Sequence, residues 1–336
     1  MGPFILHILR VIRVDCHVHT AALLAGHGYV SDRARRGLPF RWMRRQLALP
    51  ALDDDAMIER ALEDALLGAL SGAPSVDAAV VLAFDAVYAA DGRRDDAATH
   101  LYVANDYVAA LAARHPKIRF GASVHPYRRD AVAEVERCAR AGAVLCKWLP
   151  ITQRIDPADA RCIPVYEALA HFGLPLLSHT GWEHALPRLD PTVAAPARLV
   201  PALERGVTVI AAHCGTGRVP GEGSYLRQFM RLAGQHERLY GDTAGLNLPN
   251  RWGDYDALLG DEVVRGKLVH GSDWPVPAYP RPWRHGWRGT RALLAERNQL
   301  QRDVLIKRAL GFDDAYWRRG GELLRVGGRD EGRPGP

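Results

Sequence analysis

VDCHVHT, residues 14–20, is a short apolar run that ends in polar side chains able to carry chemistry. Runs of the same kind recur along the chain and alternate with longer segments of helical periodicity. Short, β-branched apolar runs predict buried strands, and the longer segments predict helices. Eight strands are expected, at Val11–Cys16, Ala78–Phe84, Ile118–Val124, Ala143–Trp148, Leu174–His179, Val207–His213, Leu239–Thr243 and Lys267–Asp273.

Helices are expected between and after these strands. They are placed at Asp54–Leu70, Thr99–Arg114, Asp130–Ala141, Cys162–Phe172, Ala195–Arg205, Tyr225–His236, Asp254–Arg265 and about Thr290–Leu310. Near-continuous apolar strands, each followed by a helix, indicate a parallel sheet with both faces covered. Eight such units predict an α/β protein with a closed (β/α)8 TIM barrel, and an open doubly wound sheet is the structural alternative.

The length of 336 residues would allow two domains, but the regular spacing of the units favours one. We expect a single catalytic barrel domain at residues 1–326, with insertions at about 21–52 and 274–289. Residues 327–336 read GGRDEGRPGP and predict a flexible tail. A composition of 48% hydrophobic and 24% charged residues excludes the disordered, fibrous and membrane classes.

Charge and cysteine usage bear on partners and compartment. The 44 Lys and Arg exceed the 38 Asp and Glu by six, and much of the excess is arginine in residues 33–45 and 281–291. No basic stripe interleaved with aromatics is present, so we expect a small anionic substrate and no nucleic-acid partner. Five cysteines without CxxC pairs favour a reducing compartment. Residues 4–12 include His7 and Arg10, so we expect no signal peptide, no membrane helix and a cytoplasmic location.

Polar residues stand at the ends of most predicted strands. They are His17 and His19, His125, Lys147, His179, His213, Asp242 and Asp273. From Lys147 onward the members at successive strand ends follow one another at intervals of 29 to 34 residues, which is the length of one strand and helix unit. Catalytic residues of barrels lie at the carboxyl ends of different strands. Equal spacing therefore predicts that these side chains converge above the barrel.

A divalent metal ion is the expected occupant of that position. His17 and His19 are two residues apart at a strand end, where alternation places both side chains on one face. Imidazole nitrogens combined with a carboxylate suit Zn²⁺ best, and Mn²⁺, Fe²⁺ and Co²⁺ are the other candidates.

Four segments together resemble a known family. VDCHVHT (14–20), LLSHTGWE (176–183), AAHCG (211–215) and VHGSDWP (269–275) are similar to the metal-dependent amidohydrolase superfamily. The resemblance is to its amidohydrolase-2 branch of TIM-barrel hydrolases and decarboxylases related to aminocarboxymuconate-semialdehyde decarboxylase. It implies one or two ions, a homodimer, and His17, His19, His179 and Asp273 as ligands of the principal metal.

The resemblance leaves two roles open. His213 would be a ligand of a second metal or, in members with one metal, a free base or electrophile that stabilises the oxyanion. Lys147 corresponds to a lysine that some members carboxylate to bridge two metals, and an unmodified lysine that binds a substrate carboxylate is the alternative. A bound ion lowers the pKa of its water to about 7, and Asp273 would be both ligand and proton shuttle.

Loop residues on the same face are candidates for substrate contacts. They are Trp182, Glu183, Arg218, Arg251, Arg281 and His125, and one of the arginines is expected to bind a carboxylate. The leading hypothesis is metal-dependent hydrolysis of a small ester, lactone or amide that bears a carboxylate. The presence of Lys147, at the position of the metal-bridging lysine of some members, favours this hypothesis. Non-oxidative decarboxylation of a small aromatic or unsaturated acid is the alternative. A third hypothesis is a metal-binding barrel without turnover.

Overall fold

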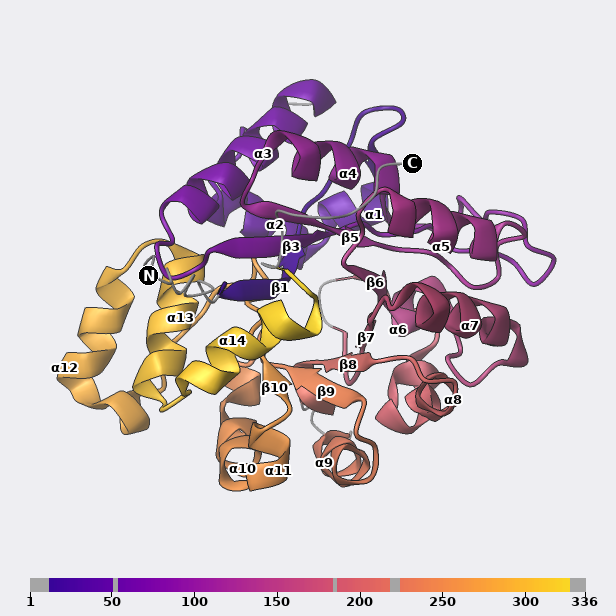
Figure 1. The fold of residues 1–336 in the computed structure, drawn as a ribbon. Helices are drawn as coiled ribbons and strands as arrows, with labels where there is room; N and C mark the ends of the chain where they lie inside the picture. The colour runs from indigo at the N-terminus through magenta and orange to yellow at the C-terminus, as the bar shows by residue number, and fades with distance from the viewer. Residues whose placement is uncertain (1–11, 51–53, 184–185, 218–223, 327–336) are drawn as a thin grey trace, which may run out of the picture.

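A parallel sheet of eight strands forms the centre of the computed structural model, which describes residues 12–50, 54–183, 186–217 and 224–326 (Figure 1). The predicted tail at 327–336 and the start of the first predicted strand at Val11 lie outside the described residues. The sheet has the order β1 (Val14–His19), β3 (Ala78–Leu82), β5 (Ile118–Ala122), β6 (Leu145–Trp148), β7 (Leu176–His179), β8 (Val209–Ala212), β9 (Leu239–Asp242) and β10 (Leu268–Val269).

The first and last strands meet and close this sheet. The amide of Cys16 donates to the carbonyl of His270 at 2.9 Å, and the amide of Asp273 donates to the carbonyl of His17 at 2.9 Å. Gly271 stands in this seam, where an added Cβ would lie 2.9 Å from the Cβ of His17. The predicted (β/α)8 TIM barrel is therefore confirmed, with each of the eight predicted strands represented.

Alternation along the strands divides the apolar side chains between two cores. Val80, Leu82, Leu145 and Ile210 point into the barrel, whereas neighbours such as Val81 point outward to the helices. Leu324 and Val326 join the inner cluster. They follow α14 (Asp314–Leu323), which crosses the end of the barrel that faces the viewer in Figure 1.

Helices surround the barrel, as the periodicity predicts (Figure 1). They are α3 (Asp55–Ser71), α4 (Asn105–Arg114), α5 (Ala131–Arg140), α6 (Pro150–Gln153), α7 (Ile163–Phe172), α8 (Val200–Glu204), α9 (Leu226–Gln235), α10 (Tyr255–Gly260), α11 (Glu262–Arg265), α12 (Pro282–Ala295) and α13 (Gln299–Ala309). Short 3₁₀ helices occupy Ala160–Cys162, Pro191–Ala194, Pro196–Leu199, His213–Gly215 and Pro249–Asp254.

The structure corrects several predicted helices. The helix predicted over Ala195–Arg205 is α-helical only in α8, and the one predicted over Asp254–Arg265 is divided into α10 and α11. The helix predicted from Thr99 begins at Asn105, because Leu101–Val103 form β4 and pair antiparallel with β2 (Gly28–Val30). The helix predicted over about 290–310 is two helices. Asn298 separates them, and its side chain accepts hydrogen bonds from the first amides of α13 and so caps that helix.

The insertion predicted at 21–52 contains two helices, α1 (Asp32–Arg36) and α2 (Leu38–Gln46). A third apolar cluster, separate from the two barrel cores, packs this insertion on α3 through Val30, Ala34 and Leu62. Arg35 strengthens the contact by an ion pair with Asp55, which has a nitrogen to oxygen distance of 2.7 Å. Among the described residues, every helix is too short or too polar to cross a bilayer.

Gly241 gives a test of the packing between β9 and α9. An added Cβ would lie 2.4 Å from Phe229 Cζ and 2.5 Å from Cys214 Sγ, and both neighbours are buried. Gly241→Ala is therefore expected to lower the free energy of unfolding by about 1 to 3 kcal/mol, measured by urea denaturation. Gly234→Ala in the exposed part of α9 is the matched control, and it should raise stability by about 0.5 kcal/mol. Equal stability of both variants would contradict this packing.

Candidate metal centre and its cavity

A β-bulge in β1 aims the first histidine at the site. Asp15 pairs with Ala79 and Val18 pairs with Val81, so Cys16 and His17 together face the one residue between these partners. Cys16 joins the barrel interior, and the bulge allows His17 to face the barrel axis as well. His19 follows two residues later on the same side, as the alternation of a strand predicts.

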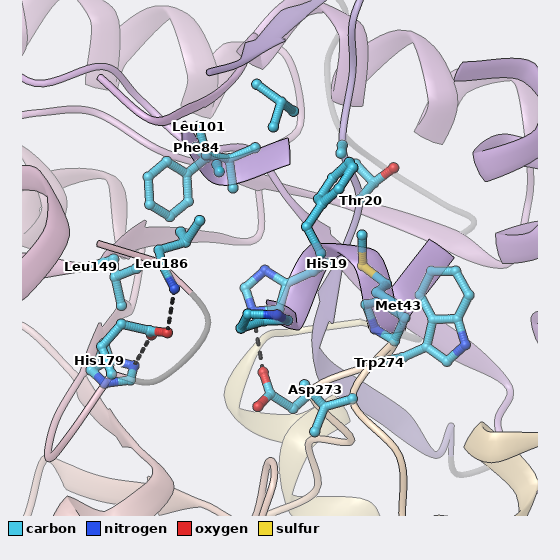
Figure 2. Close-up of a pocket in the computed structure, with 18 of the residues that line it drawn as sticks. His19, Thr20, Met43, Phe84, Leu101, Leu149, His179, Leu186, Asp273 and Trp274 are labelled. Atoms are coloured by element: carbon cyan, nitrogen blue, oxygen red, sulfur yellow. Dashed lines mark hydrogen bonds and ion pairs between the residues drawn. The ribbon is translucent and has the colours of Figure 1, made fainter. Parts of the chain in front are cut away.

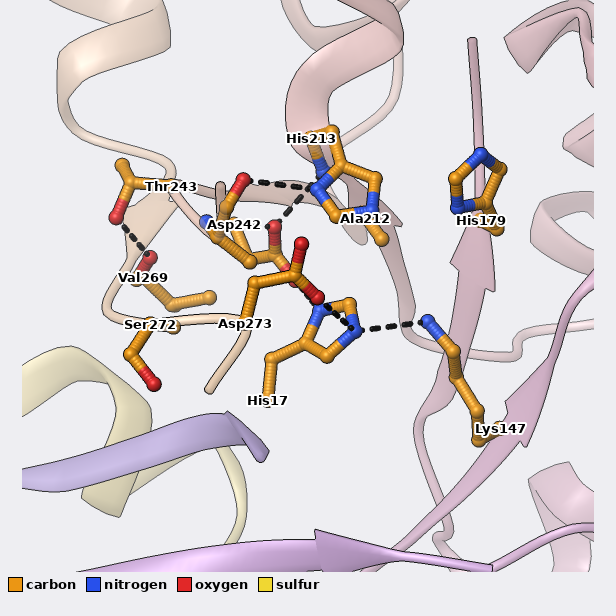
Figure 3. Close-up of polar contacts among 12 residues, drawn as sticks. His17, Lys147, His179, Ala212, His213, Asp242, Thr243, Val269, Ser272 and Asp273 are labelled. Atoms are coloured by element: carbon orange, nitrogen blue, oxygen red, sulfur yellow. Dashed lines mark hydrogen bonds and ion pairs between the residues drawn. The ribbon is translucent and has the colours of Figure 1, made fainter. Parts of the chain in front are cut away.

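Hydrogen bonds to the Nδ1 atoms of two histidines set their tautomers. His17 Nδ1 lies 2.7 Å from Asp242 Oδ2, and His213 Nδ1 lies 2.8 Å from the carbonyl oxygen of Ala244 (Figure 3). Each Nδ1 therefore carries the proton, and each Nε2 presents a lone pair. The amides of His213 and Ala244 donate to Asp242 Oδ1, so Asp242 supports His17 from a fixed position.

Ligand atoms from three strand ends converge. His17 Nε2 lies 3.1 Å from His19 Nε2, and Asp273 Oδ1 lies 3.2 Å from His19 Nε2 and 3.4 Å from His17 Nε2. His17, His213 and Asp273 each offer one ligand atom within 4.8 Å of the others. A tetrahedral ion with bonds of about 2.0 to 2.1 Å spaces its ligand atoms roughly 3.4 Å apart, so this donor set fits a divalent metal.

His179 completes the ring of histidines from β7. Its ring centroid lies 4.8 Å from that of His213, and its Nδ1 lies 3.8 Å from Glu183 Oε2. Its Nε2 is buried and has no hydrogen-bond partner among the described residues. A buried imidazole nitrogen without a partner is costly, and coordination of an ion would remove that cost.

Burial and nearby charges set the protonation states of the three buried histidines and of Asp273. Burial lowers the pKa of His17, His179 and His213 well below the ordinary range, and the Lys147 ammonium lowers the pKa of His17 and His179 further. The three rings are therefore neutral at pH 7, as ligands must be. Burial alone would raise the pKa of Asp273, but the hydrogen bond from His19 and the nearby positive charges outweigh it and lower that pKa.

Lys147 enters the site from β6. Its side chain is buried, and its Nζ lies 3.2 Å from His17 Nε2 (Figure 3). Burial lowers the pKa of this ammonium to about 8, although the carboxylates of Asp242 and Asp273 oppose the shift. Deprotonation is consequently accessible near neutral pH, and both roles considered for Lys147 fit this position.

Asp273 and His213 stand in strained backbone conformations. Their φ angles are +68° and +61°, in the left-handed region that side chains other than glycine rarely adopt. Strain of this kind costs about 1 to 3 kcal/mol at each residue and is concentrated at functional sites. These conformations turn the side chain of His213 inward directly after β8 and that of Asp273 inward four residues after the end of β10.

The site opens into a cavity of about 240 Å³. Polar residues form its floor: His19, Lys147, His179, Glu183, His213, Arg251 and Asp273. Apolar residues form its roof, among them Ala34, Phe40, Trp42, Met43, Leu62, Phe84, Leu101, Leu149 and Leu186. Figure 2 shows Phe84, Leu149 and Leu186 on one side of the opening and Met43 and Trp274 on the other.

Only some of the predicted substrate-contact residues line the cavity. Glu183 and Arg251 line the floor. Trp182 and Arg281 do not line the cavity, and Arg281 donates to the carbonyl of Trp252 at 2.9 Å. His125 also lies outside it, since its Nε2 bonds to the carbonyl oxygen of Gln153 at 2.9 Å.

Arg218, the remaining predicted contact residue, lies outside the described residues. Its place relative to the floor therefore stays a prediction.

A family model described as amidohydrolase matches residues 14–308, which span the bulged strand, all eight barrel strands and α13 almost to its end. The chain belongs to the amidohydrolase family. The resemblance read from the four sequence segments is confirmed at this level. No curated protein sequence matches this amidohydrolase significantly.

Solved structures share the fold. An uncharacterised TIM-barrel protein from Bordetella bronchiseptica has a TM-score of 0.57 at 17% identity, over 89% of this chain and 98% of its own. A probable 2-pyrone-4,6-dicarboxylic acid hydrolase from Acinetobacter baumannii has a TM-score of 0.56 at 14% identity, over 93% and 99%. The 5-carboxyvanillate decarboxylase from Sphingomonas paucimobilis has a TM-score of 0.54 at 14% identity, over 94% and 99%.

A buried polar network supports the site of this amidohydrolase from behind β10. Lys307 on α13 donates to the carbonyl of Gly271 at 2.7 Å and pairs with Asp303 at 2.5 Å. Asp15 Oδ1 accepts from the amides of His17 and Ser272 and so spans the seam. Sequence reasoning missed Lys307 and Asp303, and the signal that could have found them is a pair of opposite charges four residues apart on a predicted helix.

Removal of one ligand gives a test of the metal centre. His17→Ala is expected to weaken zinc binding by about 10- to 100-fold or more, because one of the converging nitrogens is lost. A zinc titration against a competing chelator measures this affinity, and chelation should lower the Tm of the unsubstituted protein. The exposed histidine His171 on α7 provides the control, since His171→Ala should leave the zinc affinity unchanged. Equal zinc affinities in both variants would refute this centre.

Proposed function

We propose that the chain is a metal-dependent hydrolase of small esters, lactones or amides that bear a carboxylate. The observation that carries the proposal is the arrangement of the two carboxylate oxygens of Asp273. Its Oδ1 faces His17 and His19, while no described residue donates a hydrogen bond to its Oδ2. One carboxylate can therefore hold a ligand position with one oxygen and move a proton with the other.

Zinc is the proposed ion, with manganese, iron or cobalt as substitutes, since imidazole nitrogens and a carboxylate form a common zinc set. His17, His19, His179 and Asp273 would hold the principal ion. When bound, such an ion supplies an activated water and polarises a carbonyl oxygen. A second ion would use His213 and a carboxylated Lys147.

The described residues account for the proton transfers. Asp273 is ionised near neutral pH because its pKa is lowered, so its Oδ2 can accept the proton of the attacking water and return it to the leaving group. His213 donates from Nδ1 to the carbonyl of Ala244 and is neutral. Its Nε2 is then an acceptor, which favours the role of a ligand over that of an oxyanion donor.

Arg251 is the proposed partner of the substrate carboxylate. It is 4% exposed and lines the floor, and its Nε and Nη1 have no hydrogen-bond partner among the described residues. Buried guanidinium donors without partners are strong sites for a carboxylate. In a protein with one ion, the unmodified Lys147 supplies a second positive charge at the same floor.

Decarboxylation of a small aromatic or unsaturated acid is the second candidate function. It is supported by the apolar roof, which would remove water from a substrate carboxylate, and by a structural neighbour described as a 5-carboxyvanillate decarboxylase. Hydrolysis requires a proton to be accepted from water, whereas decarboxylation requires a proton to be delivered to the carbon that loses carbon dioxide. The lowered pKa of Asp273 leaves it ionised at the start of the reaction, as an acceptor, and so favours hydrolysis. The products of the reaction separate the two.

The proposal predicts acid release, without carbon dioxide, from at least one member of a set of carboxylated lactones, esters and amides. Asp273→Asn should lower kcat by about 100-fold or more, because the amide can no longer accept the proton. Titration of released acid and a carbon dioxide assay measure the products. Asp64→Asn on the exposed side of α3 is the control and should keep full activity.

The metal content of Asp273→Asn is measured in parallel, so that loss of the ion is distinguished from loss of the proton acceptor. Carbon dioxide release without hydrolysis would establish the second candidate instead. Activity of Asp273→Asn near the original rate would remove Asp273 from the mechanism.

Arg251 gives an independent test of the anion site. Arg251→Met should raise the KM of the carboxylate substrate about 10- to 100-fold, since charge-assisted hydrogen bonds contribute about 1.5 to 3 kcal/mol. The KM of the corresponding neutral methyl ester should change much less. Arg288→Met on exposed α12 is the control. If both substrates lost affinity equally, Arg251 would be a packing residue and not the carboxylate site.

A further inference from the structure

The roof of the cavity contains apolar side chains that are at most partly buried against the protein core: Phe40 packs in part on the third apolar cluster, and Trp42 and Met43 belong to none of the three clusters. No residue of α2 is buried in the described structure, although Phe40, Trp42 and Met43 of this helix line the cavity. Trp42 is 45% exposed. Apolar surface that faces an open cavity is unfavourable until something apolar covers it.

Polar side chains of the insertion hold this helix in place without Trp42 and Met43. Arg44 donates to the carbonyl of Pro50 at 2.8 Å, and Gln46 donates to the carbonyl of Pro275 at 3.3 Å. The ion pair of Arg35 with Asp55 fixes the preceding helix on α3. The apolar face of α2 is thus positioned over the floor and is available to a ligand.

Charge in the cavity is confined to the floor. Among the described residues that line it, the cations are Lys147 and Arg251, and both stand beside the converging histidines and Asp273. The arginines of α2, Arg41, Arg44 and Arg45, do not line the cavity. A substrate that lies in this cavity therefore has one anionic, reacting end and an apolar remainder.

We infer that the substrate carries a hydrophobic acyl, alkyl or aryl body that lies against Phe40, Trp42 and Met43, and that these three residues of α2 determine its preference. The inference rests on the proposed function for its assignment of the floor to the reacting end. A second charged group at the roof would lose its water without gaining a partner. A dicarboxylate with well-separated carboxylates is accordingly disfavoured.

Equilibrium binding to the zinc-loaded protein tests the inference without turnover. The probes are acetate, butyrate, hexanoate and octanoate, with succinate, adipate and suberate as dicarboxylates of matched length, measured by titration calorimetry. The affinity of the monocarboxylates should rise by up to about fourfold for each added methylene until the cavity is filled. Each dicarboxylate should bind at least tenfold more weakly than the monocarboxylate of the same length.

Substitutions on α2 then locate the effect. Met43→Gln keeps the length of the side chain and the helix propensity but removes the apolar contact, so the increase in affinity with chain length should become smaller. Trp42→Gln is a second variant at a more exposed position. Arg45→Gln, on the outward side of the same helix, is the control and should keep the full increase.

The outcomes distinguish this inference from the proposed function. Affinity that is independent of chain length, equal binding of the dicarboxylates, or an unchanged increase in both α2 variants would overturn the inference. Binding that grows with chain length, in a protein that releases carbon dioxide or no product, would support the inference and refute only the proposed hydrolysis.

Discussion

The closure of the barrel between β1 and β10 is the constraint on which the candidate site depends. Two backbone hydrogen bonds across this seam place His17 next to Asp273, although the two residues come from opposite ends of the barrel sequence. Gly271 allows the strands to approach, since a side chain there would meet His17. The Asp15 carboxylate accepts amides from both sides of the same seam. Candidate ligands from the first and last units can meet only because the sheet closes here.

Burial then sets the protonation states at the site. Removal of water favours neutral imidazoles, and the supporting carboxylate of Asp242 and the carbonyl of Ala244 direct their lone pairs inward. The two buried ammonium groups have different surroundings. Lys307 is compensated by Asp303 at 2.5 Å, whereas Lys147 is close to the histidines and has a pKa lowered to about 8. The first therefore serves as a fixed support, and the second is chemically available.

The sequence predicts the barrel well because buried parallel strands require apolar runs, and such runs are short and separable. It predicts the approach of the strand-end residues because one unit has a nearly constant length. It fails where the local pattern is weak. Three-residue strands such as β4 carry too few side chains to show alternation, and α14 contains Gly320 and Gly321, which are unusual within a helix.

The parts of the site that the sequence does not predict are also those whose local pattern is weak or misleading. Part of the roof belongs to an insertion rich in arginine. Its apolar residues can be identified as cavity-lining only once α2 is seen to lie over the floor. His125 shows the converse error. It follows a strand in the same way as the histidines of the candidate site, yet its ring bonds to the carbonyl of Gln153 away from the cavity. Position at a strand end does not fix the direction of a side chain.

The division of the cavity into floor and roof has a consequence for how such an enzyme can diverge. The floor is held by strand ends and by the seam, whereas Phe40 and Met43 belong to an insertion with its own apolar cluster. Substitutions in groups that share no partner have additive effects on free energy. Changes in α2 can thus accumulate one at a time under selection for new substrates, while the residues that perform the chemistry keep their arrangement.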